Sequence, residues 1–331
     1  MIDLPSLARK ICAAWQRERG SQARVDALHR LSAGASAQTF ALELVEGERR
    51  HACVVQVADG GEPFAGALSK PEQARMQQAA FLAGITTPEV LLTLDDDADS
   101  AAGFVTRRTA GETLGQRIVH AAQFAAARSR LPRQCAALLA RIHALPKDQL
   151  PFLPLLSAQS QCSELAHKHR HYGEARPIFE ASLAWLRDHQ PEACSPCAVH
   201  GDFRMGNLLV DGDGLAGVLD WELAHFGDPL EDLGWLCVRS WRFGRADLPV
   251  GGFATRETFY AAYAEASGVP VEPRRVHFWE MLGTLKWGVI CQWFAQRRLS
   301  GSVRGVEPAL IGRRVSEVEL QLLDLLESRG V

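Results

Sequence analysis

The sequence predicts an α+β protein in which a strand-rich first part is followed by a larger helical part. Residues 38–45 (QTFALELV) alternate in part between apolar and polar side chains, and residues 52–58 (ACVVQVA) form an apolar run of strand length. Beyond about residue 112 the apolar side chains recur at helical spacing instead. The change from one periodicity to the other defines the fold class.

This change falls near residues 107–112, where the sequence has no flexible linker. We therefore expect two lobes that share a cleft, with residues 1–108 in the N-terminal lobe and residues 109–331 in the C-terminal lobe. Ligand pockets form preferentially at such seams.

Further elements follow from local signals. A helix is predicted to follow Pro71, a residue suited to the first helical turn, and to run to about Ala83 before stopping at Gly84. Residues 89–94 and 103–106 are predicted strands, separated by an acidic turn. The first fifteen residues have a helix-like pattern with charges through it, which is not that of a signal peptide.

Apolar stripes predict helices in the second part of the chain. The stripes comprise Cys135, Leu138, Leu139 and Ile142, then Phe179, Leu183 and Leu186, then Ile311, Val315, Val318, Leu322 and Leu325. Trp279, Trp287 and Trp293 lie in a helical pattern and are assigned to core packing. The charged run 167–171 is interpreted as a solvated surface.

Composition excludes several classes of protein. The chain has 331 residues, of which 36 are basic and 39 acidic, so its net charge of -3 gives no sign of nucleic-acid binding. No apolar run approaches the roughly 20 residues needed to cross a membrane. The eight cysteines lack regular spacing, and the Cys194–Cys197 pair has no second half that could complete a zinc site. We expect reduced thiols and a cytoplasmic location.

The segment 199–222 (VHGDFRMGNLLVDGDGLAGVLDWE) predicts a β-hairpin. A short strand at 208–210 is followed by the turn sequence DGDG and by a second strand at 215–219. An antiparallel hairpin brings its two ends together, so Asn207 and Asp220 should lie side by side. Their amide and carboxylate oxygens are hard ligands suited to Mg²⁺.

Asp202 precedes Asn207 by five residues on the loop that enters this hairpin. The catalytic loop of protein kinases, H-R-D-x-x-x-x-N, has the same spacing between Asp and Asn and is followed by a metal-binding Asp. Phosphoryl transfer needs this combination, because the protein must hold Mg²⁺ on the phosphates and orient the acceptor hydroxyl. The pattern therefore indicates a phosphotransferase.

Several segments carry a family resemblance: AGFVTRRTAGET, RIHAL, VHGDFRMGNLLV, DGLAGVLDWELAHFGDPLEDLGWLCVRSWRFG and LGTLKWGVICQ. They resemble the aminoglycoside phosphotransferase-like family, which includes choline kinase-type proteins, and most of all the kinase-like module associated with acyl-CoA dehydrogenases. The resemblance implies a bilobal protein-kinase-like fold and an ATP- and Mg²⁺-dependent kinase acting on a small-molecule hydroxyl. It suggests a hydroxyacyl-CoA or a hydroxy acid as the acceptor.

The resemblance also assigns roles to individual residues. Asp202 would be the catalytic carboxylate that accepts or orients the proton of the substrate hydroxyl. Asn207 and Asp220 would bind Mg²⁺, with Glu222 as an additional metal carboxylate. His200 would brace the catalytic loop.

The N-terminal lobe should hold the nucleotide. In the loop LSAGASAQTF, Gly34 allows close approach of the backbone to the phosphates, and Ser36 could donate to phosphate oxygens. The backbone from Thr106 to Arg108 would meet the edge of the adenine.

One position departs from the kinase pattern. Kinases have a lysine on the third strand that contacts the α- and β-phosphates and pairs with a helix glutamate. Here Gln56 occupies that position, and Glu72 or Gln73 could be its helix partner. A neutral glutamine can donate hydrogen bonds to phosphate but supplies no charge. Lys70 and Arg107 are candidates to compensate.

The sequence GDPLEDL (227–233) predicts a helix start. Asp228 would be the N-cap, Pro229 the first helical residue, and Glu231 the third residue of a capping box. Asp232 would brace the catalytic loop.

Two alternatives to a kinase stay open. Gln56 motivates a non-catalytic or weakly catalytic module that binds a nucleotide or another ligand. A metal-dependent hydrolase fits less well, because the sequence has no cluster of His and Asp ligands with hydrolase spacing.

Overall fold

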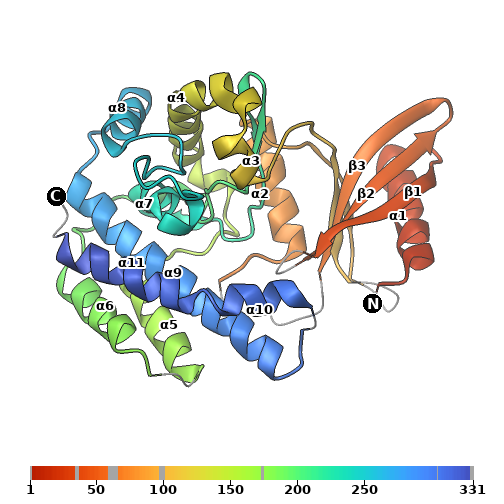
Figure 1. Ribbon diagram of the computed structural model, residues 1–331. Helices are drawn as coiled ribbons and strands as arrows, with labels where there is room; N and C mark the ends of the chain where they lie inside the picture. The colour runs from red at the N-terminus through yellow and green to blue at the C-terminus, as the bar shows by residue number, and fades with distance from the viewer. Residues whose placement is uncertain are drawn as a thin grey trace.

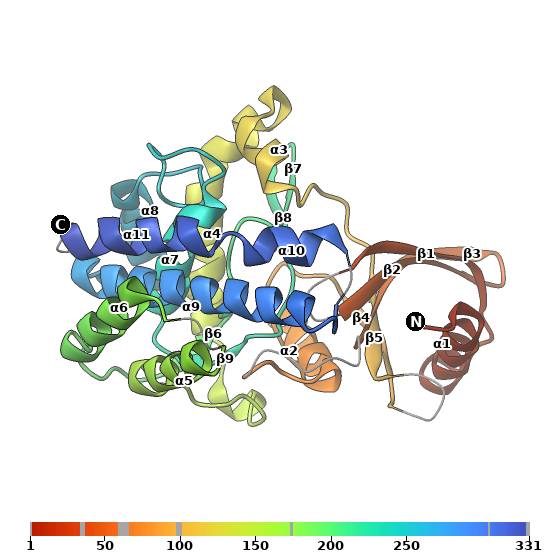
Figure 2. The ribbon, with the colours of Figure 1, turned by 60° about the horizontal axis from the view of Figure 1, so that its bottom comes forward.

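The computed structural model describes residues 2–33, 37–58, 66–96, 101–172, 175–303 and 305–328. A small lobe, made of a twisted sheet with helix α1 beside it, adjoins a larger helical lobe (Figure 1). The same two lobes can be distinguished in the turned view of Figure 2. The predicted α+β fold class, with an antiparallel sheet lobe and a larger helical lobe, is confirmed.

The sheet of the small lobe is antiparallel, with strand order β1-β2-β3-β5-β4. Its strands are β1 (Arg24–Ala33), β2 (Ala37–Glu46), β3 (Arg49–Ala58), β4 (Val90–Leu94) and β5 (Gly103–Arg107). Strands β2 and β3 pair along their whole length, from Ala37 opposite Ala58 to Glu46 opposite Arg49.

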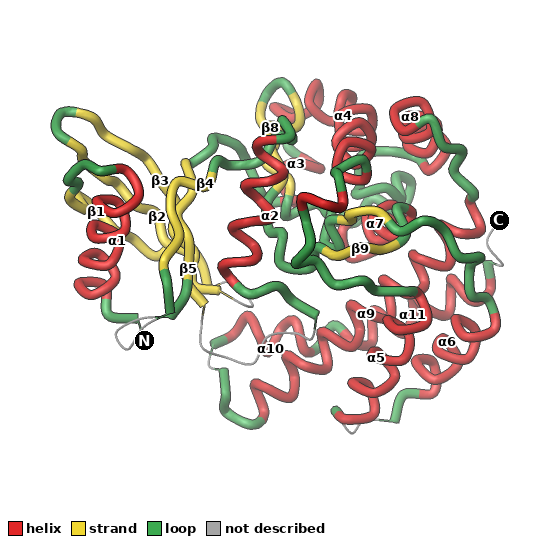
Figure 3. Tube along the Cα trace, turned by 180° about the vertical axis from the view of Figure 1, so that it is seen from behind, coloured by secondary structure: helices red, strands yellow, loops and turns green. Residues whose placement is uncertain are grey.

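Helix α1 (Leu4–Arg19) covers one face of this sheet and shares a hydrophobic core with it. That core includes Leu7, Ile11, Ala14, Trp15, Phe40, Leu42, Leu44, Cys53, Val55 and Val57. Because side chains alternate between the two faces of a strand, Val54 and Gln56 lie on the face opposite α1. In Figure 3 the sheet stands between α1 and α2, so this second face is on the side of the helical lobe.

Helix α2 (Lys70–Leu82) connects the two lobes physically. Its buried Met76 and Ala80 belong to the hydrophobic core of the helical lobe, whereas the helix also contacts β4 and β5. Just after α2, the Oγ1 atom of Thr87 donates to the carbonyl oxygen of Val218 at 2.8 Å. The division of the chain at residues 108 and 109 stays a prediction.

The helical lobe is arranged around the long helix α9 (Pro273–Leu299), which α5, α6, α7, α10 and α11 contact. Its other helices are α3 (Gly115–His120), α4 (Ala125–His143), α5 (Ala158–His171), α6 (Pro177–Asp188), α7 (Leu230–Cys237), α8 (Arg256–Ser267), α10 (Val306–Gly312) and α11 (Val315–Glu327). Short 3-10 helices span Ala122–Phe124, Lys147–Gln149 and Arg239–Trp241. Two antiparallel pairs complete the lobe: β6 (Cys197–Val199) with β9 (His225–Gly227), and β7 (Leu208–Asp211) with β8 (Gly214–Val218).

The predicted strands and the helix after Pro71 are confirmed as β2, β3, β4, β5 and α2. Strand β1 was missed, because its sequence RVDALHRLSA mixes charged and small residues with apolar ones. The expected loop from Leu31 to Phe40 was therefore too long: β1 continues to Ala33 and β2 begins at Ala37. Backbone pairing between the two strands, rather than side-chain pattern, extends them.

The predicted stripe from Ile311 to Leu325 lies on two helices instead of one, since α10 ends at Gly312 and α11 begins at Val315. Gly312 packs against α9 so closely that a Cβ atom there would lie 2.9 Å from the Cα atom of Ala295. The charged run in α5 is not wholly solvated, because His169 is buried and its Nδ1 lies 3.0 Å from the Oε1 of Gln292.

Other predictions hold in the described residues. Trp279 and Trp293 are buried, and Trp287 is half-buried. All eight cysteines are free. None of the helices described is long and apolar enough to cross a membrane.

The contact between α7 and α9 gives a first testable prediction. A Cβ atom at Gly234 would lie 2.6 Å from backbone atoms of Trp279 and Glu280, so alanine cannot fit unless the helices separate. We expect Gly234→Ala to lower the free energy of unfolding by about 1–3 kcal/mol, measured by urea denaturation. The control is Gly212→Ala in the β7–β8 turn, where the added Cβ meets nothing within 4 Å. Equal stability of the two variants would contradict the close packing.

Candidate active site

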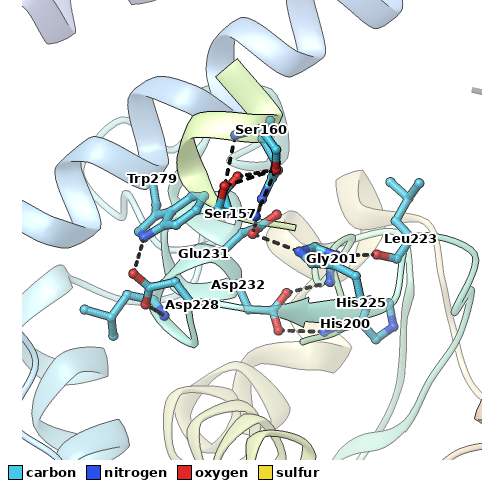
Figure 4. Close-up of polar contacts among 12 residues, drawn as sticks. Ser157, Ser160, His200, Gly201, Leu223, His225, Asp228, Glu231, Asp232 and Trp279 are labelled. Atoms are coloured by element: carbon cyan, nitrogen blue, oxygen red, sulfur yellow. Dashed lines mark hydrogen bonds and ion pairs between the residues drawn. The ribbon is translucent and has the colours of Figure 1, made fainter. Parts of the chain in front are cut away.

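The loop that follows β6 is held by one buried carboxylate from α7. The backbone nitrogens of His200 and Gly201 donate to Asp232 at 2.8 and 2.9 Å (Figure 4). The Nε2 atom of His143 on α4 lies 3.0 Å from the same carboxylate. Burial raises the pKa of Asp232, but these hydrogen bonds and the nearby histidines more than offset it and bring the pKa below its ordinary value. The prediction that Asp232 braces this loop is confirmed by its hydrogen bonds to the backbone of His200 and Gly201.

Gly201 cannot be replaced without moving this loop. Its φ angle is +75°, in the left-handed region that favours glycine. A Cβ atom there would also lie 2.2 Å from the carbonyl oxygen of Leu223. His200 braces the loop from the other side, because its Nε2 lies 3.1 Å from the carbonyl oxygen of Leu219 and its Nδ1 accepts from the backbone nitrogen of Asp202 at 3.2 Å.

Asp202 is buried, and three side chains fix its carboxylate. The indole Nε1 of Trp235 donates to Oδ1 at 2.7 Å, and the Nε of Arg204 donates to the same oxygen at 3.0 Å. The amide nitrogen of Asn207 donates to Oδ2 at 2.6 Å. The carboxylate is therefore oriented before any ligand binds, as a catalytic group requires. Its catalytic role stays a prediction.

The predicted hairpin is confirmed as β7 and β8, with Leu208 opposite Val218. Its two ends meet, because the backbone nitrogen of Leu219 donates to the carbonyl oxygen of Asn207 at 2.8 Å. Asp220 follows directly, with a φ angle of 66° that is uncommon for a residue other than glycine. Such strained conformations concentrate at functional sites.

The carboxylates near the hairpin end form a negatively charged cluster. Burial raises the pKa of Asp220 to about 8, and the neighbouring carboxylates of Glu222 and Asp202 add to the effect. Lys70 and Arg204 oppose it. A group that is both desolvated and surrounded by like charges is a suitable site for a cation.

The donor set fits Mg²⁺. The amide nitrogen of Asn207 is bound to Asp202, which leaves its carbonyl oxygen for a metal beside the carboxylate of Asp220. Mg²⁺ commonly binds through one or two protein oxygens together with substrate phosphates and water. Within the described ranges, no group of three His, Cys, Asp or Glu side chains forms a complete metal cage. The metal assignments of Asn207, Asp220 and Glu222 stay predictions.

The predicted nucleotide residues divide into two groups. Gln56 on β3 and Thr106 on β5 lie on paired strands, where Gln56 is opposite Phe104. Arg108 follows β5 and is exposed, and its backbone nitrogen donates to the carbonyl oxygen of Ala52 at 2.9 Å. Strands β3 and β5 are neighbouring inner strands of the sheet, so these positions lie close to one another. Gly34 and Ser36 lie outside the described residues.

Glu72 lies apart from that group. It completes a capping box with Ser69, whose backbone nitrogen donates to the Glu72 carboxylate at 2.8 Å. Gln73 is the buried neighbour, and its Oε1 accepts from the Nζ of Lys70 at 2.7 Å. The side chain of Glu72 is thus engaged at the helix start, and its nucleotide role stays a prediction.

The predicted capping box at α7 is wrong. The helix begins at Leu230 with Pro229 as N-cap, although the Asp228 carboxylate still accepts from the Leu230 nitrogen at 3.0 Å. Glu231 is buried and lies 3.1 Å from the Nε2 of His225 instead of reaching back to the helix start (Figure 4). Asp228 also binds Trp279 on α9, at 2.8 Å.

Trp235, Arg204 and His143 were not predicted as site residues. Trp235 has a signal in the sequence, since it lies three residues after Asp232 and so shares its helical face. Arg204 lies between Asp202 and Asn207, and its guanidinium is 4.6 Å from the ring centre of Trp241. No local pattern indicates His143, which reaches Asp232 from another helix.

Comparison with known proteins agrees with this geometry. The model of the phosphotransferase enzyme family matches residues 27–279, and the chain belongs to that family. Acyl-CoA dehydrogenase family member 10 of Mus musculus is 29% identical over 165 residues, which cover 46% of this chain and 15% of the mouse protein. Acyl-CoA dehydrogenase family member 11 of Rattus norvegicus is 28% identical over 162 residues, which cover 44% of this chain and 20% of the rat protein. The alignments thus span a fifth or less of these relatives.

Solved structures share the fold. A candidate aminoglycoside phosphotransferase of Ralstonia eutropha superposes with a TM-score of 0.74 at 18% identity, over 99% of both chains. A choline/ethanolamine kinase family protein of Mesorhizobium loti has a TM-score of 0.60 at 17% identity, over 91% of this chain and 88% of the other. The complex of APH(2")-IIIa with GDP and kanamycin has a TM-score of 0.61 at 13% identity, over 96% and 98%. The kinase-like fold is therefore shown.

The buried pair of His225 and Glu231 gives a prediction on pH. Burial lowers the pKa of His225, but the Glu231 carboxylate raises it above its ordinary value. A raised histidine pKa stabilises the fold fully below about pH 6.5, and the contribution is lost as pH rises through the folded-state value. We expect His225→Gln to cost about 2 kcal/mol of unfolding free energy at pH 6 and less at pH 9.

Urea denaturation at both pH values measures this difference. The control is His167→Gln on the exposed side of α5, which should change stability little at either pH. A cost for His225→Gln that grows toward pH 9 would contradict the assigned charge pair.

Proposed function

We propose that this protein transfers the γ-phosphoryl group of ATP to the hydroxyl of a small molecule, in the presence of Mg²⁺. The observation that carries the proposal is the Asp202 carboxylate, held by Trp235, Arg204 and Asn207 at 2.6–3.0 Å beside the Asp220 end of the hairpin. An oriented carboxylate next to oxygen ligands suits phosphoryl transfer, where positioning and electrostatics supply most of the catalysis.

Asp202 would accept the proton of the acceptor hydroxyl as that oxygen attacks the γ-phosphorus. The new oxygen–phosphorus bond forms while the bond to the β-phosphate bridging oxygen breaks, and its electron pair leaves with ADP. Asn207 and Asp220 would hold Mg²⁺, with Glu222 as a further carboxylate. The ion supplies neutralisation of phosphate charge when it is bound.

The acceptor is proposed to be a hydroxyacyl-CoA or a hydroxy acid. Support comes from the relatives, which are named as acyl-CoA dehydrogenases and match this chain over less than half its length. The kanamycin complex belongs to a structural neighbour of 13% identity, so it supports the fold and not the acceptor.

A second candidate is a kinase-like module that binds nucleotide with little or no turnover. Gln56 favours it, because β3 has no cation at the position where kinases carry a lysine. The two candidates differ in a single measurable property, which is phosphoryl transfer to an acceptor.

ATP consumption tests the proposal. Purified protein with Mg²⁺ is assayed against hydroxyacyl-CoAs, hydroxy acids, amino alcohols, sugars and an aminoglycoside. We expect turnover with one class and a loss of at least about a hundredfold in Asp202→Asn, because the proton acceptor is removed. The matched control is Asp213→Asn, whose carboxylate is exposed in the hairpin turn and should leave turnover unchanged. Full activity of Asp202→Asn would refute the mechanism, and ATP binding without turnover for every acceptor would favour the second candidate.

Trp235→Phe tests whether the orientation of Asp202 matters. Phenylalanine keeps an aromatic ring on α7 but removes the indole donor that lies 2.7 Å from Oδ1 of Asp202. We expect kcat to fall about tenfold with little change in KM, since the lost contact acts on the chemical step. Steady-state kinetics and the thermal midpoint are measured together. An unchanged kcat in a folded variant would show that this contact does not position the carboxylate.

A further inference from the structure

Helix α8 is connected to the loop after β6 through one buried tyrosine. Tyr263 is 3% exposed, and its hydroxyl lies 2.7 Å from the Nδ1 of His143 at the end of α4. On the other side of the same ring, Nε2 lies 3.0 Å from the Oδ2 of Asp232 on α7. This path of contacts joins α8, α4 and α7, and it ends at the carboxylate that holds the backbone of His200 and Gly201.

The hydrogen bonds around Asp232 decide which nitrogen of His143 carries a proton toward it. Burial raises the pKa of Asp232, but the hydrogen bond from His143 and the other contacts bring it below its ordinary value, so the carboxylate is ionised and can only accept. Both of its oxygens already accept from backbone nitrogens. The Nε2 atom of His143 must therefore be a donor, which leaves Nδ1 to the Tyr263 hydroxyl.

The Tyr263 hydroxyl is suited to this position. Burial raises the pKa of Tyr263 above its ordinary value, so the hydroxyl keeps its proton and can donate to Nδ1 as well as accept. The His143 side chain is only 6% exposed, so solvent has little access to its ring. Tyr263→Phe would leave a buried ring nitrogen unpaired, which is costly. The hydroxyl therefore favours the ring orientation in which Nε2 meets Asp232.

We propose that Tyr263 is a positioning residue of the loop that carries Asp202, and that it acts through His143 and Asp232. The inference rests on the proposed function, because it takes Asp202 to be the catalytic carboxylate. Asp202 directly follows Gly201, whose backbone nitrogen donates to Asp232. A looser hold on that nitrogen misplaces the Asp202 carboxylate, and a small misplacement of a reacting group slows the chemical step.

Amide hydrogen exchange of the full chain measures the hold on this loop without any acceptor. In Tyr263→Phe we expect the amides of His200 and Gly201 to exchange about tenfold faster, because the His143 ring has lost a partner. The amide of Leu285, in the buried part of α9, should keep its rate, since it reports on the stability of the whole helical lobe.

The matched control is Tyr260→Phe, which makes the same chemical change on the same helix. The Tyr260 hydroxyl has a hydrogen bond with Cys237 and so lies outside the path to Asp232. Three results would each overturn the inference: unchanged exchange of the loop amides in Tyr263→Phe, an equal acceleration at Leu285, or the same effect in Tyr260→Phe.

A double-mutant cycle tests whether Tyr263 acts through His143. His143→Leu removes both ring nitrogens, so we expect fast exchange of the loop amides and less than about twofold further acceleration when Tyr263→Phe is added. His143→Gln keeps an amide nitrogen that can donate to Asp232 and should bring exchange back to within about threefold of the wild type. Full additivity of the two changes, or no recovery in His143→Gln, would contradict the proposed path. The comparison of Tyr263→Phe with Tyr260→Phe decides the matter where His143→Leu does not fold.

Steady-state kinetics separates this inference from the proposed function. With an acceptor that the wild type phosphorylates, Tyr263→Phe should lower kcat about tenfold and leave the KM for ATP within about twofold, because the orientation of Asp202 affects the chemical step. An unchanged kcat despite faster loop exchange would refute the positioning role and leave transfer standing. Faster loop exchange in Tyr263→Phe, when the wild type phosphorylates no acceptor, would refute transfer and support the hold of Tyr263 on the loop.

Discussion

The hydrogen bonds between Asp232 and the loop after β6 are the interaction on which the rest of the site depends. The carboxylate is fully buried and accepts from the backbone of His200 and Gly201, and His143 lies against it. Removing water from a carboxylate is costly unless it is hydrogen-bonded on all sides, so the loop has one favourable position. Because Trp235 stands on the same helix as Asp232, fixing α7 also fixes the donor to Asp202.

Helix α9 holds α7 and the loop after β6 in place against the rest of the helical lobe. Gly234 lets α7 approach α9 until their backbones nearly touch, and Trp279 on α9 donates to Asp228 just before α7. Lys286, also on α9, donates to the carbonyl oxygen of Gly201 at 3.3 Å. The loop after β6 is therefore supported by helices, which hold side chains more accurately than loops do.

Charged side chains surround the end of the β7–β8 hairpin. Burial raises the pKa of Asp220, and the neighbouring carboxylates of Glu222 and Asp202 raise it further. Arg204, on the loop after β6, and Lys70, at the start of α2, are the cations that lower this pKa. The chain belongs to the phosphotransferase enzyme family, and its fold is shared with a solved structure at 18% identity. Burial and the balance of nearby charges together therefore determine the pKa of Asp220.

By itself, the sequence determined the local features of this protein. The spacing of Asp202 and Asn207, the DGDG turn and the position of Asp220 lie within twenty residues, so turn chemistry and strand alternation suffice to bring them together. The strands β2 to β5, the helix α2 and the helical stripes were likewise predicted from short-range pattern. Strand β1 was not, because its pairing with β2 and not its own composition makes it a strand.

Only the tertiary structure decided which distant residues complete the site. The choice between Glu72 and Gln73 depended on which face of α2 is buried, and Glu72 proved to be engaged by Ser69 at the helix start. His143 reaches Asp232 across 89 residues of chain, and Lys70 acts on Asp220 from the start of α2. Contacts between elements far apart in the chain produce no local pattern in the sequence. They depend on how whole helices pack and on which side chains this packing removes from water.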